Sequence, residues 1–160
     1  MKEVADLLNR PAHRIIHVCE TKVVRPAVDA EGRGTVRRFS RDDIFRIRLA
    51  LELQDVGVEL PDIKPLMRAL DQFLDIAETL NGTEWHLTNF DLVSAINHVK
   101  SMHKVMRAYL VRNDRPRIFI PGFRVGFHHG HPLRLLTKDG DFDWPAVTVV
   151  VELTLLTADL

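Results

Sequence analysis

Apolar residues at the start of the chain recur at helical spacing and predict a short helix followed by a tight turn. The apolar positions of this helix are Val4, Ala5, Leu7 and Leu8. Asn9 and Arg10 form the turn, and Pro11 opens a second helix. Pro suits the first helical position because its φ is already fixed and its missing N–H would be unpaired there in any case.

The second predicted helix has one apolar and one polar side. Its inner side carries Ile15, Ile16 and Val18. His13, Arg14 and His17 are left to face outward. Two short helices joined in this way form a helix-turn-helix pattern, in which the second helix is shaped to enter a major groove.

The segment after the second helix predicts a basic β-hairpin. Val23, Val24 and Pro26 lead into residues 27–39, whose tip at residues 31–34 contains two glycines that can adopt the positive φ of a tight turn. Three arginines crowd this segment: Arg33, Arg37 and Arg38. A helix-turn-helix followed by a basic hairpin is a winged helix-turn-helix, whose wing is suited to the flanking phosphates.

Two longer helices follow. Ser40 and Asp43 predict a capped start, and Gly57 suits the left-handed residue that ends the helix. This helix has two apolar stripes, Ile44, Ile47, Leu51 and Leu49, Leu53, Val56. Pro61 opens the next helix, which Asn81 and Gly82 end, and Pro65 predicts that its regular part begins only there because Pro lacks the N–H.

A further helix is expected over residues 88–110. Thr88 followed three residues later by Asp91 indicates a capped start. Apolar and near-apolar positions then alternate by four and three over about three heptads, which favours packing against a partner helix. The stripe consists of Leu92, Ile96, Val99, His103, Met106 and Leu110.

The last third is rich in β-forming residues. Short β segments are expected at 117–121, 124–127 and 133–137, followed by a long strand over 146–157. The valines of that strand alternate in a way that predicts burial on most of both faces. Residues 81–87 and 111–117 are the expected linkers.

Charge is arranged in blocks, although the formal net charge of the 160 residues is zero. Residues 1–48 carry 11 Lys and Arg against 7 Asp and Glu, and residues 101–135 carry 7 against 1. A local basic face is what phosphate binding requires, so a neutral total does not exclude nucleic acid. No apolar run is long enough to span a membrane, which predicts a cytoplasmic protein without membrane association.

Several separately spaced segments between residue 2 and about residue 70 resemble the MerR-type transcriptional regulators. They are the apolar first helix and the recognition helix, Val23-Val24-Arg25-Pro26, Arg37-Arg38-Phe39-Ser40, Asp43-Ile44, and the spaced set Leu53, Gly57, Leu60 and Ile63. The chain departs from the family where Lys22 replaces a usual Gly, His17 and Val18 replace a Tyr-Tyr pair, and Cys19 replaces the following Glu. These departures bear on the operator sequence more than on the fold.

The resemblance implies dimerisation through a helix placed after the DNA-binding domain, here near residues 88–110, and therefore a two-fold-symmetric promoter site of double-stranded DNA. The residues expected at the DNA are His13, Arg14, His17, Lys22, Arg33, Arg37 and Arg38. The helix residues would read base edges and the hairpin arginines would contact phosphates. A solvated basic face is the plainer alternative. Arg41, Arg46 and Lys64 are weaker candidates for phosphate contacts.

Other candidate chemistry is sparse. His128, His129 and His131 form a weak candidate metal site, but no acidic or thiol ligand accompanies them in that loop, so a solvated or partner-facing loop is favoured. Cys19 is the only cysteine, which excludes a cysteine-cluster zinc site and favours a small apolar role over a thiol sensor. The aromatic residues are expected in the core rather than around an effector: Trp85, Tyr109, Phe123, Phe127 and Trp144.

These patterns predict an α+β protein and no enzyme, because no motif for catalysis is present; no cofactor and no bound metal are expected. Residues 1–80 would form a MerR-like winged helix-turn-helix domain. Residues 81–160 would hold the dimerisation helix and a small effector or oligomerisation region. The predicted function is a homodimeric, sequence-specific transcriptional regulator. The alternative is a winged-helix module for protein interaction, or an architectural or excisionase-like module in DNA transactions.

Overall fold

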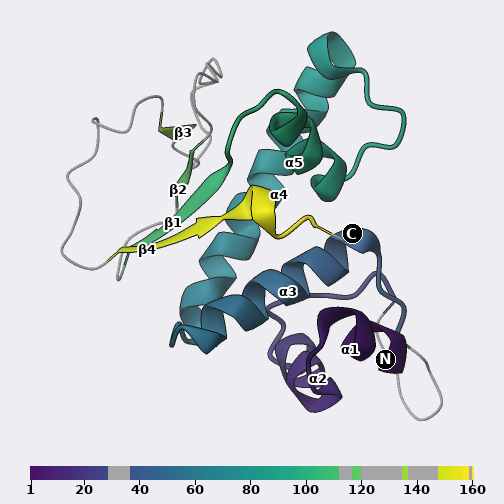
Figure 1. Ribbon diagram of the computed structural model, residues 1–160, viewed down its shortest axis with the longest axis vertical. Coiled ribbons are helices and arrows are strands. Elements are labelled where there is room, and N and C mark those ends of the chain that lie inside the picture. Colours follow the sequence, from purple (N-terminus) through teal and green to yellow (C-terminus); the bar gives the residue numbers. More distant parts are fainter. Residues whose placement is uncertain (29–36, 112–116, 120–134, 137–147, 159) are drawn as a thin grey trace. The chain divides into compact units, whose positions relative to one another are not determined.

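The computed structural model of the chain describes residues 1–28, 37–111, 117–119, 135–136, 148–158 and 160 (Figure 1). The chain divides into two compact units, Met1–Met67 with Leu160, and Arg68–Asp159. The division falls inside a helix, between Met67 and Arg68, and the domain boundary at residues 80 and 81 stays a prediction. Helices and a small sheet are both present, so the expectation of an α+β protein is confirmed at this level.

The first unit contains the predicted helix-turn-helix. Helix α1 spans Lys2–Leu8, α2 spans Ala12–Glu20, α3 spans Arg41–Asp55, and α4 begins at Leu60. Helix α2 packs against both α1 and α3. Its Ile15 and Val18 are fully buried, and so are Phe45 and Leu49 of α3, because the apolar side of each helix is removed from water.

Helices in this unit end on left-handed residues. After α2, Lys22 has φ 57°, its N–H donates to the carbonyl of Cys19, and the N–H of Val23 donates to the carbonyl of Val18. This pair of bonds is a Schellman ending, which satisfies carbonyls that the helix leaves free. Asn9 and Gly57 occupy the same position after α1 and α3, with φ 50° and 87°. The helix ends predicted at Asn9 and Gly57 are therefore confirmed.

Helix α3 has the predicted cap. The Ser40 hydroxyl accepts from the N–H of Asp43 at 3.1 Å, and the Asp43 carboxylate accepts from the N–H of Ser40 at 2.8 Å. One assignment to the apolar stripes was wrong, because Val56 is 67% exposed. It lies beyond the last helical residue, where the chain turns at Gly57 and no longer follows the helical repeat.

Helix α4 runs from Leu60 to Leu80 with Pro65 inside it. The expectation that regular helix begins only at Pro65 was wrong. The backbone carbonyl of Glu59 accepts from the N–H groups of Asp62 and Ile63, which starts the helix before the proline. Because Pro65 lies in the second turn, its missing N–H removes a single bond near the free end.

The second unit continues from α4 through a π-helical turn at Asn81–Trp85 to helix α5, Leu92–Ser101. The predicted linker at 81–87 is therefore largely a helical turn, and its Trp85 is buried. The predicted helix over 88–110 was also wrong. Asp91, not Thr88, caps α5, with its side chain accepting from the N–H of Ser94 at 2.6 Å.

Helix α5 ends well before the last positions of the predicted heptad stripe. His103 has φ 55° and is the left-handed residue of a Schellman ending. Its N–H donates to the carbonyl of Lys100, and the N–H of Lys104 donates to the carbonyl of Val99. Leu110 lies on a strand. The helical members of the stripe, Leu92, Ile96 and Val99, are all fully buried in the single chain. They are therefore not available as a seam for a second copy.

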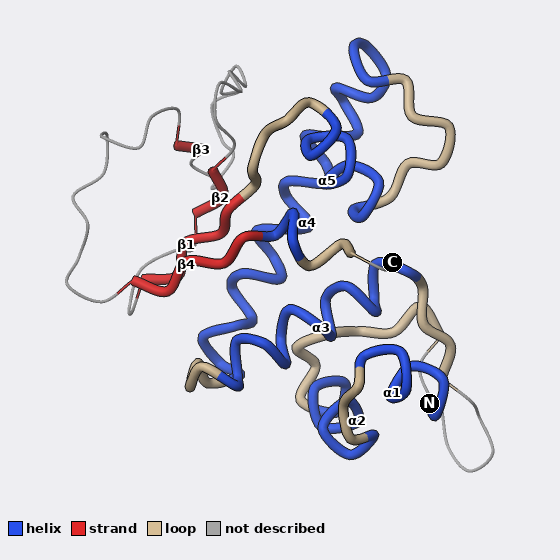
Figure 2. Tube along the Cα trace, viewed as in Figure 1, coloured by secondary structure: helices blue, strands red, loops and turns tan. Residues whose placement is uncertain are grey.

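A four-stranded sheet completes the second unit (Figure 2). The order is β3-β2-β1-β4, with β1 antiparallel to β2 and β4, and with β2 parallel to β3. The strands are β1 Arg107–Val111, β2 Arg117–Phe119, β3 Leu135–Leu136 and β4 Thr148–Glu152. The β region is thus present, although the segment 124–127 lies outside the described residues.

The last strand is shorter than predicted. Strand β4 ends at Glu152, and a 3-10 turn, η2 at Leu153–Leu155, follows and packs against α5 and β1. Val150 is 50% exposed, so the expectation that most of both faces of this strand are buried was wrong. Among the described residues, no helix is both long and apolar enough to cross a membrane.

Candidate nucleic-acid interface

Helix α2 exposes a polar face that an outside partner can reach. Ile15, Val18 and Cys19 point into the core, which leaves His13, His17 and Glu20 exposed. These three recur at intervals of four and three, so they share one side of the helix. We call His13, His17 and Glu20 the reading face. Within the described part of the chain, neither imidazole of this face makes a hydrogen bond or an ion pair, so both keep their bonding groups for a ligand.

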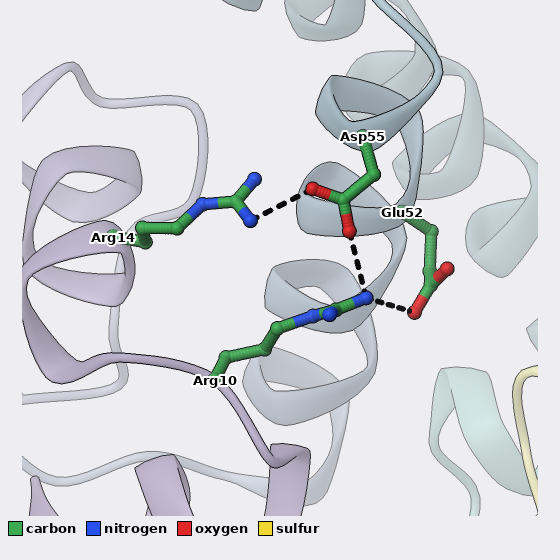
Figure 3. A network of polar contacts seen from close by, with 4 residues as sticks. All are labelled: Arg10, Arg14, Glu52 and Asp55. Carbon is green, nitrogen blue, oxygen red and sulfur yellow. Dashed lines mark hydrogen bonds and ion pairs between the residues drawn. The ribbon is translucent and has the colours of Figure 1, made fainter.

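Arg14 is placed differently from the two histidines. Its Nη1 lies 2.7 Å from Oδ1 of Asp55 on α3, and the arginine side chain is only 29% exposed. The second oxygen of the same carboxylate, Oδ2, lies 2.8 Å from Nη2 of Arg10 in the turn. That Nη2 also donates to Oε1 of Glu52 at 2.9 Å. Figure 3 shows the four side chains converging between the turn, α2 and α3.

We call Arg10, Arg14, Glu52 and Asp55 the arginine clamp. It joins α2 and the turn before it to the last turn of α3 at two points, Arg10 and Arg14, four residues apart. The side chains are 29 to 46% exposed, so water screens the pairs and each adds little to stability. The clamp therefore links α2 and the turn before it to α3 without being a main source of stability.

The base of the predicted hairpin is present in the first unit. Val28 and Arg38 pair in antiparallel fashion, with the N–H of each donating to the carbonyl of the other at 3.2 and 3.0 Å. Arg38 is exposed and Arg37 is half-buried. Residues 29–36, which include Arg33 and the tip, lie outside the described residues.

Asp43 connects this hairpin base to α3. Its Oδ2 accepts from the N–H of Ala27 at 2.9 Å and from the N–H of Ser40 at 2.8 Å. Ala27 precedes one paired residue and Ser40 follows the other by two positions, so one carboxylate holds both ends of the segment. Asp43 is 7% exposed. The same group that caps α3 therefore positions the arginines of the hairpin base.

Lys22 lies at the end of α2, exposed and in the left-handed region. A residue with a Cβ is strained at such a φ, whereas Gly is not. This position is the one where the resemblance leads to the expectation of a Gly. The backbone here adopts a left-handed φ that suits a glycine, and a positively charged residue occupies it.

The structure brings six of the seven expected DNA-contacting residues into one compact unit, with Arg33 outside the described residues. Sequence reasoning missed the acidic partners Glu52 and Asp55, and the exposed Glu20. The first two lie three residues apart, so a helix presents them on one face. Nothing local in the sequence indicates that these ion pairs form across 41 to 45 positions of chain.

The remaining candidates are less informative. Cys19 is 3% exposed, which favours a packing role over that of a sensor. Trp85 is buried and lies 4.8 Å from the ring of His98, as a core aromatic does. His128, His129 and His131, with Phe123, Phe127 and Trp144, lie outside the described residues. In the part that is described, no group of three or more metal-ligating side chains comes together.

Comparison with known proteins agrees with the geometry of the first unit. No curated protein and no solved structure gives a significant match to the chain. A family model does match, over residues 1–70, which hold α1, α2, the hairpin base, α3 and the first half of α4. Its description is MerR HTH family regulatory protein, so the resemblance of the N-terminal part of this chain to MerR-type regulators is confirmed.

Proposed function

We propose that this protein is a sequence-specific DNA-binding transcriptional regulator that acts as a homodimer on a two-fold-symmetric promoter site. The observation that carries the proposal is the reading face of α2 within a segment that matches MerR-type regulators. A helix packed on one side and polar on the other, at the second position of a helix-turn-helix, is the element that enters a major groove.

The chemistry of the reading face suits base edges. A neutral imidazole offers one donor and one acceptor, and His13 and His17 lie one helical turn apart. Purines present N7 acceptors in the major groove together with O6 or N6 groups, so two imidazoles can read successive steps. Glu20 supplies an acceptor, which fits the N4 amino group of cytosine.

The hairpin base supplies the positive charge that the reading face lacks. Arg38 is exposed beside the Val28 pair, and Lys22 is exposed at the end of α2. Phosphate contacts from such residues fix the register of a protein on the duplex without reading its sequence. The winged form of the domain belongs to this proposal and rests on the paired hairpin base.

The proposal of a homodimer rests on the short length of α2 and on two-fold symmetry. Helix α2 has nine residues, about 13 Å at ~1.5 Å per residue, so one copy can read only a few base pairs. Two copies related by a two-fold axis double the site and produce inverted half-sites. Since Leu92, Ile96 and Val99 are buried within one chain, the proposed dimer uses other surfaces.

Selection from a random duplex library tests the proposal. The full chain is incubated with the library, and bound duplexes are recovered, amplified and sequenced. Enrichment of an inverted repeat by the native chain is expected. The paired change His13→Ala with His17→Ala should abolish enrichment, whereas Lys100→Ala, a basic surface residue of α5, should leave it unchanged. Absence of any enriched sequence would overturn the regulator and favour the protein-interaction module.

A further inference from the structure

The two carboxylates of the arginine clamp lie at the C-terminal end of a helix, where negative charge is least favourable. Glu52 and Asp55 lie in the last turns of α3, which has no basic residue in its last turn. The C-terminal end of a helix carries partial negative charge, so a carboxylate there is unfavourable unless a cation neutralises it. Arg10 and Arg14 are those cations, and they come from outside α3.

We propose that Asp55, assisted by Glu52, is a specificity-determining residue that withholds Arg10 and Arg14 from DNA while it orients the recognition helix. This inference rests on the proposed function, because it concerns how the same site discriminates among duplexes. It assigns Arg14 the role of a positioning residue, in place of the base-reading role expected from the sequence.

The formal charge of the arginine clamp explains why it matters that Arg10 and Arg14 are kept from DNA. The clamp contains two guanidinium groups and two carboxylates, so its formal charge is zero. With the carboxylates removed, the same position beside the reading face would carry two free cations. A free arginine near the duplex binds phosphate in any sequence, so it raises affinity for all DNA equally and lowers the ratio of specific to non-specific binding.

The geometry of the ion pairs supports the proposed role of Asp55 in orienting α2. Asp55 uses both oxygens, Oδ1 for Arg14 and Oδ2 for Arg10, so one carboxylate fixes two points of the turn and helix. Bonds at Arg10 and Arg14 together resist both sliding and rotation of α2. Base reading depends on the angle at which His13 and His17 meet the groove, so loss of this restraint loosens recognition.

The test compares Asp55→Asn with the matched control Glu59→Gln. Both changes remove one negative charge. Glu59 is exposed and has no ion pair in the described part of the chain, so its loss frees no arginine. Binding to the duplex enriched by selection and to a scrambled duplex of the same composition is measured by fluorescence anisotropy at several salt concentrations.

Asp55→Asn is expected to bind the scrambled duplex about fivefold more tightly than the native chain. Its specificity ratio should fall by at least the same factor. The slope of log affinity against log salt should steepen by about 1, as for one added phosphate contact. Glu59→Gln should change affinity for the scrambled duplex less than twofold. In an Arg14→Ala background the effect of Asp55→Asn should shrink to that of the control.

Unchanged or weaker binding of Asp55→Asn to the scrambled duplex, with a native circular dichroism spectrum, would overturn the inference and leave the proposed function standing. A native chain that binds no duplex in a salt-dependent way would overturn both. If Asp55→Asn does not fold, Glu52→Gln replaces it, since Glu52 contacts only Arg10 in the clamp. That variant must then show the same directions with a smaller change.

Discussion

Removal of the Asp43 side chain is expected to loosen the hairpin base from α3. In Asp43→Ala, the N–H groups of Ala27 and Ser40 lose their shared acceptor, which lies at 2.9 and 2.8 Å, and the reciprocal cap of α3 loses one of its two bonds. Asp43→Asn serves as the matched variant. It keeps one side-chain oxygen at similar volume and removes the charge.

The expected loss of stability in Asp43→Ala follows from the kind of hydrogen bond that is removed. A hydrogen bond to a charged group contributes about 1.5 to 3 kcal/mol when it is shielded from water. Ala27 and Ser40 are themselves exposed, so water can replace part of each bond, and the lower end applies. Asp43→Ala should therefore lower the free energy of unfolding by roughly 2 to 3 kcal/mol. Asp43→Asn should lower it by about half as much, since the acceptor remains but its charge does not.

Urea denaturation followed by circular dichroism at 222 nm measures both changes, with the m value checked for each variant. Thermal unfolding should show a loss of roughly 4 to 10 °C for the alanine variant. A loss below about 0.5 kcal/mol in Asp43→Ala, well under the value of a single such bond, would refute the reasoning. It would mean that the Asp43 carboxylate does not hold the hairpin base.

Four further substitutions test other parts of the structure. Lys22→Gly should raise the free energy of unfolding by about 0.5 to 1 kcal/mol, because it relieves a left-handed φ of 57°; a loss measured in urea would contradict this. Arg10→Ala and Arg14→Ala should each cost less than about 1 kcal/mol, since the ion pairs are partly exposed; a larger loss by the same assay would make the clamp a principal source of stability. Ile96→Ala should cost roughly 2 to 5 kcal/mol without changing the sedimentation coefficient, because Ile96 is buried within its own chain; dissociation of a dimer without loss of stability would restore the predicted seam.

Local signals in the sequence predicted the first unit well. Ser40 and Asp43 act over three residues, and Asn9 and Gly57 act through their own φ, so neighbouring residues suffice to place these helix ends. Pro11 is the N-cap of α2, with an extended ψ of 134°, and not the first helical residue that the sequence predicted. The contact between Asp43 and Ala27 spans 16 positions and was not predictable in this way. The same holds for the ion pair of Arg14 with Asp55, which depends on how α2 packs against α3.

In the second unit, the heptad spacing of apolar residues led to the wrong prediction of a helix over residues 88–110. Leu92, Ile96 and Val99 fit a heptad because they are the buried side of α5, and Met106 and Leu110 happened to continue the count. The spacing of apolar residues does not distinguish a helix that continues from a buried strand that follows. The residue that ends α5 on a left-handed φ is His103, which carries none of the signal that Gly or Asn provides.

The salt dependence of binding between the full chain and its enriched duplex tests the central claim most directly. If the exposed face of α2 and the hairpin base contact DNA in two copies, log affinity should fall linearly with log salt, with a slope of about −4 or steeper. Affinity should also exceed that for a scrambled duplex by about a thousandfold or more. A slope near zero, or equal affinity for both duplexes, would contradict a sequence-specific DNA-binding regulator.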